Sequence, residues 1–156
     1  MAWAILVARP EPSLRARALR LLARREHSRE ELRRKLERFA AEGENVDAVL
    51  NDLAQRGWLS DARFAEQAIR ARSRRFGPLK LAHYLKSRGL GEEIIAAGIK
   101  AAGVDGTASI EAIWRSRFRD LPIDEREKAR QVRFLQGRGF PLDEIFRFLK
   151  QMETSP

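Results

Sequence analysis

The sequence contains no cysteine, so it can form neither a disulfide framework nor a thiolate metal site. Its two histidines, His27 and His83, have no sequence-adjacent cysteine or aspartate and no second histidine at ligand spacing, and we expect neither to bind a metal or catalyse a reaction. No apolar run approaches the length of a membrane span. The apolar residues 1–7 are too short for a signal peptide and lack a basic start. These absences predict a cytoplasmic protein without a cofactor.

Loops of the kind that bind nucleotide phosphates are also missing. The segments Gly89-Leu90-Gly91 and Gly137-Arg138-Gly139 follow predicted helices rather than strands, and Gly-Lys-Ser/Thr occurs nowhere. Helix C-caps or corners explain these glycines better. No enzyme motif remains, and we predict a protein that is not an enzyme.

Positive charge is in excess. The chain has 31 basic and 22 acidic residues, a net charge of +9, and 25 of the basic residues are arginine. The planar guanidinium group offers two donors in register to a phosphate or a carboxylate. The composition therefore predicts a polyanion or an acidic protein surface as partner. The alternative is an arginine-rich organism in which these side chains only face water.

An apolar pattern occurs three times along the chain, at intervals of 49 and 50 residues. The matching positions are Leu36, Leu85 and Leu135; Val46, Ile95 and Ile145; and Leu50, Ile99 and Leu149. The second and third copies also share an Arg-Gly corner, at Arg88-Gly89 and Arg138-Gly139. Such a repeat predicts stacked copies of one small helical unit and an elongated binding protein.

Helix start signals divide each copy into three helices. Ser28 with Glu31 has capping-box spacing, Asp124 with Glu127 repeats it, and Ser60 is a further N-cap candidate. Pro78 and Pro141 are each expected at a first helical position. The predicted helices are 13–26, 28–41, 45–56, 60–75, 77–88, 91–102, 107–120, 124–137 and 141–153.

We therefore predict an all-α fold, an elongated tandem array of three-helix repeats over residues 13–56, 57–102 and 107–153. The glycines of the segment 103–106 suggest a hinge between the second and third repeats. Because each unit is small, neighbouring units should share contacts. The large aromatic side chains proposed for these seams are Trp58, Phe64, Trp114 and Phe118.

The middle copy has the most one-sided charge. Residues 60–88 hold eight basic side chains against Asp61 and Glu66, a net charge of +6. Like charges at this density repel one another on a helix, which favours a neutralising partner over a merely solvated face. In the first copy, by contrast, arginines alternate with glutamates at ion-pair spacing, as in Glu30 and Arg34. The candidate binding residues are Arg63, Arg70, Arg72, Arg74, Arg75, Lys80, Lys86 and Arg88.

Two stretches of the sequence are distinctive: Ser28-Arg-Glu-Glu-Leu-Arg-Arg-Lys-Leu36 and Leu53-Ala-Gln-Arg-Gly-Trp-Leu-Ser-Asp-Ala-Arg-Phe-Ala65. They resemble the RecX family, and the similarity continues through Gly77-Pro78-Leu79-Lys80 and Leu85-Lys-Ser-Arg-Gly-Leu90. It covers about residues 14–150, with Trp58 where tyrosine is usual and Gln131 where the other copies have Leu32 and Leu81.

The resemblance implies tandem three-helix repeats and a regulator of the recombinase RecA. Members of this family bind in the helical groove of the RecA–DNA filament, suppress its ATP hydrolysis and strand exchange, and bind DNA, which implies a role in recombination, DNA repair and the SOS response. The family supplies no catalytic residue to carry over, and its central motif, here Gly57 to Asp61 with Arg63 and Phe64, is architectural.

Our leading interpretation is a monomeric regulator that lies along a RecA filament and contacts protein and DNA together. The partners are then RecA and single- and double-stranded DNA, without a membrane. One alternative is a helix-turn-helix-like protein that binds DNA without RecA; its exposed arginines favour phosphate contacts over base-specific ones. Another is a passive helical scaffold for an acidic protein. DNA binding alone should weaken steeply with salt, and a scaffold should show no DNA affinity.

Overall fold

Helices account for all the regular secondary structure in residues 9–104 and 106–155, which the computed structural model describes; residues 1–7, considered above as a signal peptide, lie outside this part. The nine helices predicted from the sequence are confirmed there, with bounds within a few residues of those expected. They are α1 (Leu14–Arg24), α2 (Arg29–Glu37), α3 (Val46–Gln55), α4 (Asp61–Arg72), α5 (Pro78–Ser87), α6 (Glu92–Ala102), α7 (Thr107–Arg115), α8 (Glu125–Gly137) and α9 (Leu142–Thr154).

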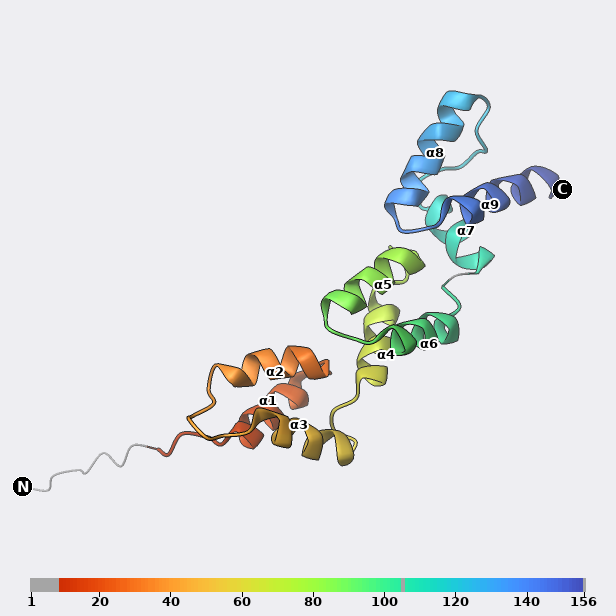
Figure 1. Ribbon diagram of the computed structural model, residues 1–156. Coiled ribbons are helices and arrows are strands. Elements are labelled where there is room, and N and C mark those ends of the chain that lie inside the picture. The colour runs from red at the N-terminus through yellow and green to blue at the C-terminus, as the bar shows by residue number, and fades with distance from the viewer. Residues whose placement is uncertain (1–8, 105, 156) are drawn as a thin grey trace, which may run out of the picture.

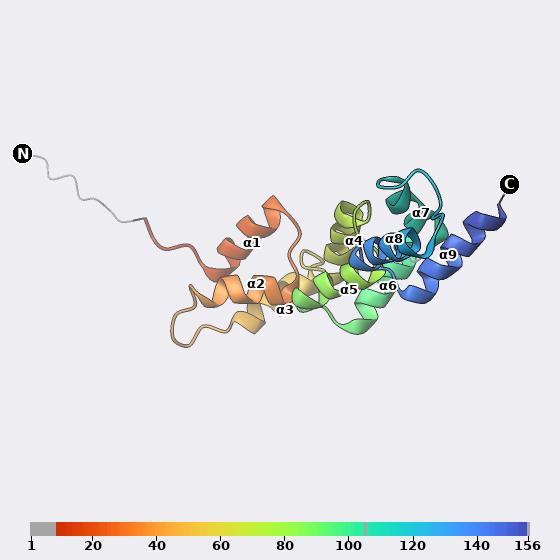
Figure 2. The same ribbon diagram turned by 90° about the horizontal axis from the view of Figure 1, so that it is seen from above.

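The helices form three bundles of three, each with its own apolar core. The cores centre on Leu32 and Leu36 in the first bundle, Leu81 and Leu85 in the second, and Leu135 and Ile145 in the third. Every extensive helix–helix contact lies within one bundle. The bundles follow one another along the molecule, which is elongated in both views (Figures 1 and 2). The predicted tandem array is therefore confirmed.

The limits of the repeats and the hinge stay predictions. Leu59 packs in the first core and Val104 in the second. Gly103 ends α6 in the left-handed conformation, with φ of 65°, and Asp105 lies outside the described residues.

Several predicted helix starts have the expected hydrogen bonds. The Glu31 amide donates to Ser28 Oγ over 3.1 Å, the Arg63 amide to Ser60 Oγ over 3.2 Å, and the Glu127 amide to Asp124 Oδ1 over 2.8 Å. The capping box at Ser28 is only half formed, because the Glu31 carboxylate accepts from Arg25 instead of from the backbone of Ser28. Pro78 begins α5 as predicted, whereas Pro141 is the residue before α9.

Gln131 replaces a leucine in the third core and is buried there. Its side-chain oxygen accepts from Trp114 Nε1 over 2.8 Å, and its side-chain nitrogen donates to the carbonyl oxygen of Asp120 over 3.1 Å. Both polar ends of the amide are paired, so the substitution leaves no buried polar atom without a partner.

The prediction that four aromatic side chains form the seams between bundles is wrong. Phe64 is in the middle core, Trp114 and Phe118 pack in the third core, and Trp58 is exposed beside Arg15 and Arg56 of the first bundle. Phe64, Trp114 and Phe118 pack against apolar side chains of their own bundles. Hydrogen bonds and ion pairs join the bundles at the seams instead.

The first seam joins the corner between α5 and α6 to the start of α2. Ser28 Oγ donates to the carbonyl oxygen of Arg88 over 2.7 Å, and the Arg29 amide donates to Asp61 Oδ1 over 2.8 Å. An ion pair of 2.8 Å between Arg63 and Glu26 also spans this seam. The first amides of a helix have no partner within it, so these contacts use donors and acceptors that the fold leaves open.

The second seam repeats this construction one unit further on. The Gly77 amide donates to the carbonyl oxygen of Arg138 over 2.7 Å, and the Leu79 amide to that of Gly139 over 2.9 Å. The corner between α8 and α9 thus meets the start of α5. Consequently α2, α5 and α8 follow one another along the molecule, each corner facing the start of the preceding helix (Figure 1).

Candidate functional site

A groove of about 400 Å³ lies between α4 and α5 beside the first seam. Tyr84 lies in it with two guanidinium groups over its ring: Arg72 Cζ is 3.8 Å and Arg88 Cζ is 5.1 Å from the ring centre. Arg25, from the end of α1, reaches the same groove from the first bundle. We call Arg25, Arg72, Tyr84 and Arg88 the Tyr84 cluster.

Polar contacts of the buried Glu31 connect this cluster to the first bundle. The Glu31 carboxylate receives two hydrogen bonds from Arg25, of 2.5 and 3.1 Å, and lies 3.7 Å from Arg88. Burial opposes ionisation of Glu31, but the hydrogen bond and charge of Arg25 outweigh it and hold the pKa of this carboxyl below its ordinary value. Glu31 is therefore ionised and offsets part of the positive charge of the cluster.

A second cationic cluster lies at the second seam around Phe76. Arg75 Cζ, Lys80 Nζ and Arg138 Cζ are 5.6, 5.4 and 6.0 Å from the centre of its ring. Arg138 comes from the third bundle, and its guanidinium group also donates to the carbonyl oxygen of Arg75 over 3.2 Å. We call Arg75, Phe76, Lys80 and Arg138 the Phe76 cluster.

The two clusters share a repeated element. Arg138 lies 5.2 Å from the ring of Phe134, four residues before it, as Arg88 lies over Tyr84. Both arginines occupy an Arg-Gly corner whose carbonyl oxygen accepts a hydrogen bond from the preceding bundle. The seam and the cationic cluster are therefore built from the same corner residue.

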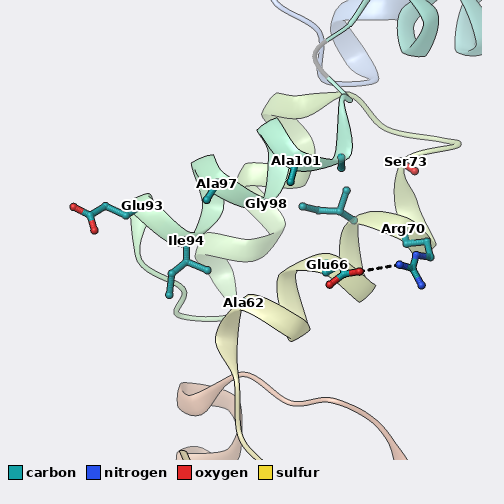
Figure 3. A pocket seen from close by; sticks show the side chains of 11 residues that line it. Ala62, Glu66, Arg70, Ser73, Glu93, Ile94, Ala97, Gly98 and Ala101 are labelled. Atoms are coloured by element: carbon teal, nitrogen blue, oxygen red, sulfur yellow. Dashed lines mark hydrogen bonds and ion pairs between the residues drawn. The ribbon is translucent and has the colours of Figure 1, made fainter. Parts of the chain in front are cut away.

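The remaining predicted residues lie elsewhere. Arg63 is held by Glu26, and Arg70 pairs with Glu66 over 2.9 Å on the lip of a groove between α4 and α6 (Figure 3). Lys86 lines a third groove, between α5 and α6, and Arg74 is exposed. The structure therefore brings Arg72 together with Arg88, and Arg75 with Lys80, but distributes the other four over separate surfaces.

Sequence reasoning missed Arg25 and Arg138. The recurring Arg-Gly corner was a signal for Arg138, since Arg138 matches Arg88 in the repeat. Arg25 stands among arginines that pair within the first copy, and no local pattern sets it apart. Only its position across the seam shows that it belongs with Arg72 and Arg88.

In both clusters, aromatic rings hold cationic hydrogen-bond donors in place. Aromatic rings restrict the guanidinium groups stacked on them while leaving their edges available to an anion. The contacts suit phosphate groups along a backbone, which carry no base identity. In residues 9–104 and 106–155 no three His, Asp or Glu side chains are arranged to hold a metal ion. No helix of this part is long and apolar enough to cross a membrane.

Family models of the three-helix domains of RecX match the chain in the same order. The first domain matches residues 15–53, the second residues 60–99 and the third residues 105–149. The chain is also similar to proteins named regulatory protein RecX. One from Chromobacterium violaceum is 44% identical over 133 residues, which cover 85% of this chain and 86% of that protein. One from Leptothrix cholodnii is 41% identical over 142 residues, covering 91% and 90%.

Solved structures show the same fold. A crystal structure of RecX from Lactobacillus salivarius superimposes with a TM-score of 0.74 at 18% identity, covering 91% of this chain and 96% of that one. A second crystal structure of a regulatory protein RecX gives a TM-score of 0.73 at 19% identity, covering 88% of this chain and 71% of that one. At this identity the similarity supports the fold alone.

Proposed function

The chain belongs to the RecX family, and on this premise we propose that it regulates RecA by binding along the RecA–DNA filament and lowering its ATP hydrolysis and strand exchange. It performs no catalysis and takes part in cytoplasmic DNA recombination and repair. The observation that supports this proposal is the presence of the Tyr84 and Phe76 clusters at successive seams of an elongated array.

The array suits a filament because its units can meet successive binding positions. Once one unit is bound, the next binds at a high effective concentration, so weak contacts reinforce one another. The candidates that the two clusters unite, Arg72, Arg75, Lys80 and Arg88, lie beside aromatic rings, where they can pair with backbone phosphates. Such contacts give affinity for single- and double-stranded DNA with little sequence preference.

The test is ATP hydrolysis by RecA on single-stranded DNA with increasing amounts of this protein. We expect the wild type to lower the rate, and Arg72→Gln/Lys80→Gln to require several-fold more protein because one cation is lost from each cluster. Arg147→Gln/Lys150→Gln is the matched control: it removes two exposed cations from α9, outside both clusters. An unchanged ATPase rate at saturating wild-type protein would refute the proposal.

The clusters alone also favour the second candidate, a protein that binds DNA non-specifically without RecA. Bare-DNA affinity should fall steeply with salt, and loss of one phosphate contact should reduce the slope of log K against log salt by about 1. The filament regulator should keep a salt-resistant component from protein contacts. Equal salt dependence on bare DNA and on the filament would support the second candidate.

A further inference from the structure

The middle bundle leaves both flanks of α6 open. A groove of about 640 Å³ lies between α4 and α6, and one of about 570 Å³ lies between α5 and α6. Figure 3 shows the first groove, with Ala97, Gly98 and Ala101 of α6 facing α4. Ile95 is the buried residue of α6, and the helix otherwise exposes mostly small side chains.

Larger side chains stand beside the corresponding helices of the other two bundles. Counting by the repeat intervals, Ala82 and Ala96 correspond to Arg33 and Asp47 in the first bundle, which form an ion pair between α2 and α3. In the third bundle the residue at the position of Ala96 is Phe146, with Lys128 Nζ 5.8 Å from its ring centre. Two alanines in the middle bundle leave this space empty.

The groove between α4 and α6 has a similar origin. Gly98 corresponds to Val49 in the first bundle and to Phe148 in the third, where the Phe148 ring packs 5.8 Å from that of Trp114. A Cβ at Gly98 would lie 3.1 Å from Ile69 Cδ1, so the close approach of α4 and α6 favours glycine. The middle bundle therefore has small residues beside both grooves, at positions where the other bundles have larger side chains.

An apolar lining distinguishes this surface from the cationic clusters. Leu79 and Ile99 are among the apolar residues that line the α5/α6 groove, and Lys86 and Lys100 also line it. In the described part of the chain neither lysine pairs with a carboxylate, although Glu92 lines the same groove. The Tyr84 cluster occupies the remaining groove of the same bundle, between α4 and α5.

We propose that the two grooves beside α6 bind protein: a segment of the filament's subunits that inserts apolar side chains and presents carboxylates to Lys86 and Lys100. This inference rests on the proposed function and divides its binding residues between two partners. Arg72 and Arg88 meet nucleic acid on the α4/α5 side of the bundle, whereas Lys86 meets protein beside α6. The apolar floors exclude a phosphate backbone, and the lysines complement acidic side chains.

The test fills each groove with larger side chains, three of them taken from matching positions of other repeats, without changing net charge. Ala82→Arg/Ala96→Asp introduces the ion pair of the first bundle, and Ala97→Gln/Ala101→Gln fills the other groove; Gln151 stands at the position of Ala101 in the third bundle. Ala48→Gln is the control, because Ala48 is exposed on α3 at the position of Ala97. Thermal unfolding establishes that each variant is folded.

We expect each groove variant to require at least about tenfold more protein than wild type for half-maximal inhibition of the RecA ATPase, as for the loss of a central interface contact. Binding to single-stranded DNA alone should stay within about twofold, and Ala48→Gln should match wild type in both assays. Wild-type inhibition by folded groove variants would overturn this inference and leave the proposed function standing. Failure of the wild type itself to inhibit would remove both.

Two further outcomes would also overturn it. Equal losses of DNA binding and ATPase inhibition would assign the grooves to nucleic acid. A wild-type dimer in sedimentation that the groove variants abolish would assign them to a second copy of this chain.

Discussion

His27 is buried at the first seam, where its Nδ1 lies 3.0 Å from the carbonyl oxygen of Arg25 and its Nε2 lies 3.0 Å from Lys35 Nζ. Nδ1 therefore donates and Nε2 accepts, which requires the neutral ring. Burial and the charges of Arg25 and Lys35 hold the pKa of His27 below its ordinary value, against the opposing effect of the backbone hydrogen bond. Protonation of His27 would therefore break its contact with Lys35, and we expect the stability of the first seam to depend on pH.

We expect stability to fall on acidification. A folded-state pKa below the unfolded value gives His27 a contribution that is complete above about pH 6.5 and is lost as the pH falls through the folded value. Glu31, whose pKa is also lowered, loses its contribution at lower pH still, below about pH 4.3. Melting temperatures between about pH 7 and pH 5 should decline less for His27→Gln than for wild type. Parallel curves would contradict this assignment.

The buried pair of Trp114 and Gln131 gives a second prediction at this scale. Trp114→Phe removes the indole donor and leaves the Gln131 oxygen without it, at a cost of about 1–3 kcal/mol. Gln131→Leu leaves the indole N–H unpaired at a similar cost. The double variant Trp114→Phe/Gln131→Leu should lose less than the sum of the two single changes in urea unfolding. Strict additivity would show that the two side chains do not depend on each other.

Single side chains also mark the limit of sequence reasoning. Ser28, Ser60 and Asp124 could be predicted as caps because their hydrogen bonds are local. Arg63 could not be separated from the binding candidates, because its partner Glu26 is 37 residues away. Charge counting finds a basic segment, but only the folded chain shows which cations are already paired.

At the scale of elements, apolar spacing and caps predicted the helices, but nothing local predicted how one bundle meets the next. The two Arg-Gly corners can be recognised in the sequence as a repeated feature. Their hydrogen bonds to the starts of α2 and α5 can be seen only in the folded structure. Gly89 and Gly139 have φ of 82° and 101°, and a Cβ at either position would lie within 3 Å of the preceding bundle, at Glu30 and Lys80 respectively. Glycine at each corner therefore permits both the turn and the close approach.

Gly89→Ala should destabilise the protein more than Gly57→Ala. Both glycines have positive φ, so alanine is strained at each by about 1 kcal/mol. At Gly57 no atom lies within 4 Å of the new Cβ, whereas at Gly89 it would lie 2.5 Å from Glu30 Cβ. Urea unfolding should show the larger loss for Gly89→Ala, together with increased proteolysis at the first seam. Equal losses would mean that the seam accommodates the methyl group freely.

At the scale of the whole molecule, stability is divided among three cores joined by narrow polar seams. In such an array each unit depends mainly on its immediate neighbours. A destabilising substitution in one terminal bundle should therefore affect the other terminal bundle only weakly, whereas it would destabilise the whole of a protein with a single core.

Ile145→Ala tests this arrangement. Ile145 is fully buried in the third core, and its truncation should cost about 2–5 kcal/mol. Amide hydrogen exchange should become faster in α7, α8 and α9, while α1, α2 and α3 keep their protection. Uniformly faster exchange along the chain would show that the bundles unfold as one unit. Leu36→Ala, buried in the first core, is the reciprocal change and should reverse the pattern.

Each seam is asymmetric, because it joins a corner of one bundle to a helix start of the preceding bundle. Repeating such a joint gives the described array a direction, because each helix start meets a corner that comes later in the chain: Ser28 meets Arg88, and Gly77 meets Arg138. An array with two different ends matches a directional filament in one orientation only. For the proposed binding to the RecA–DNA filament, we therefore expect a single polarity of the bound molecule.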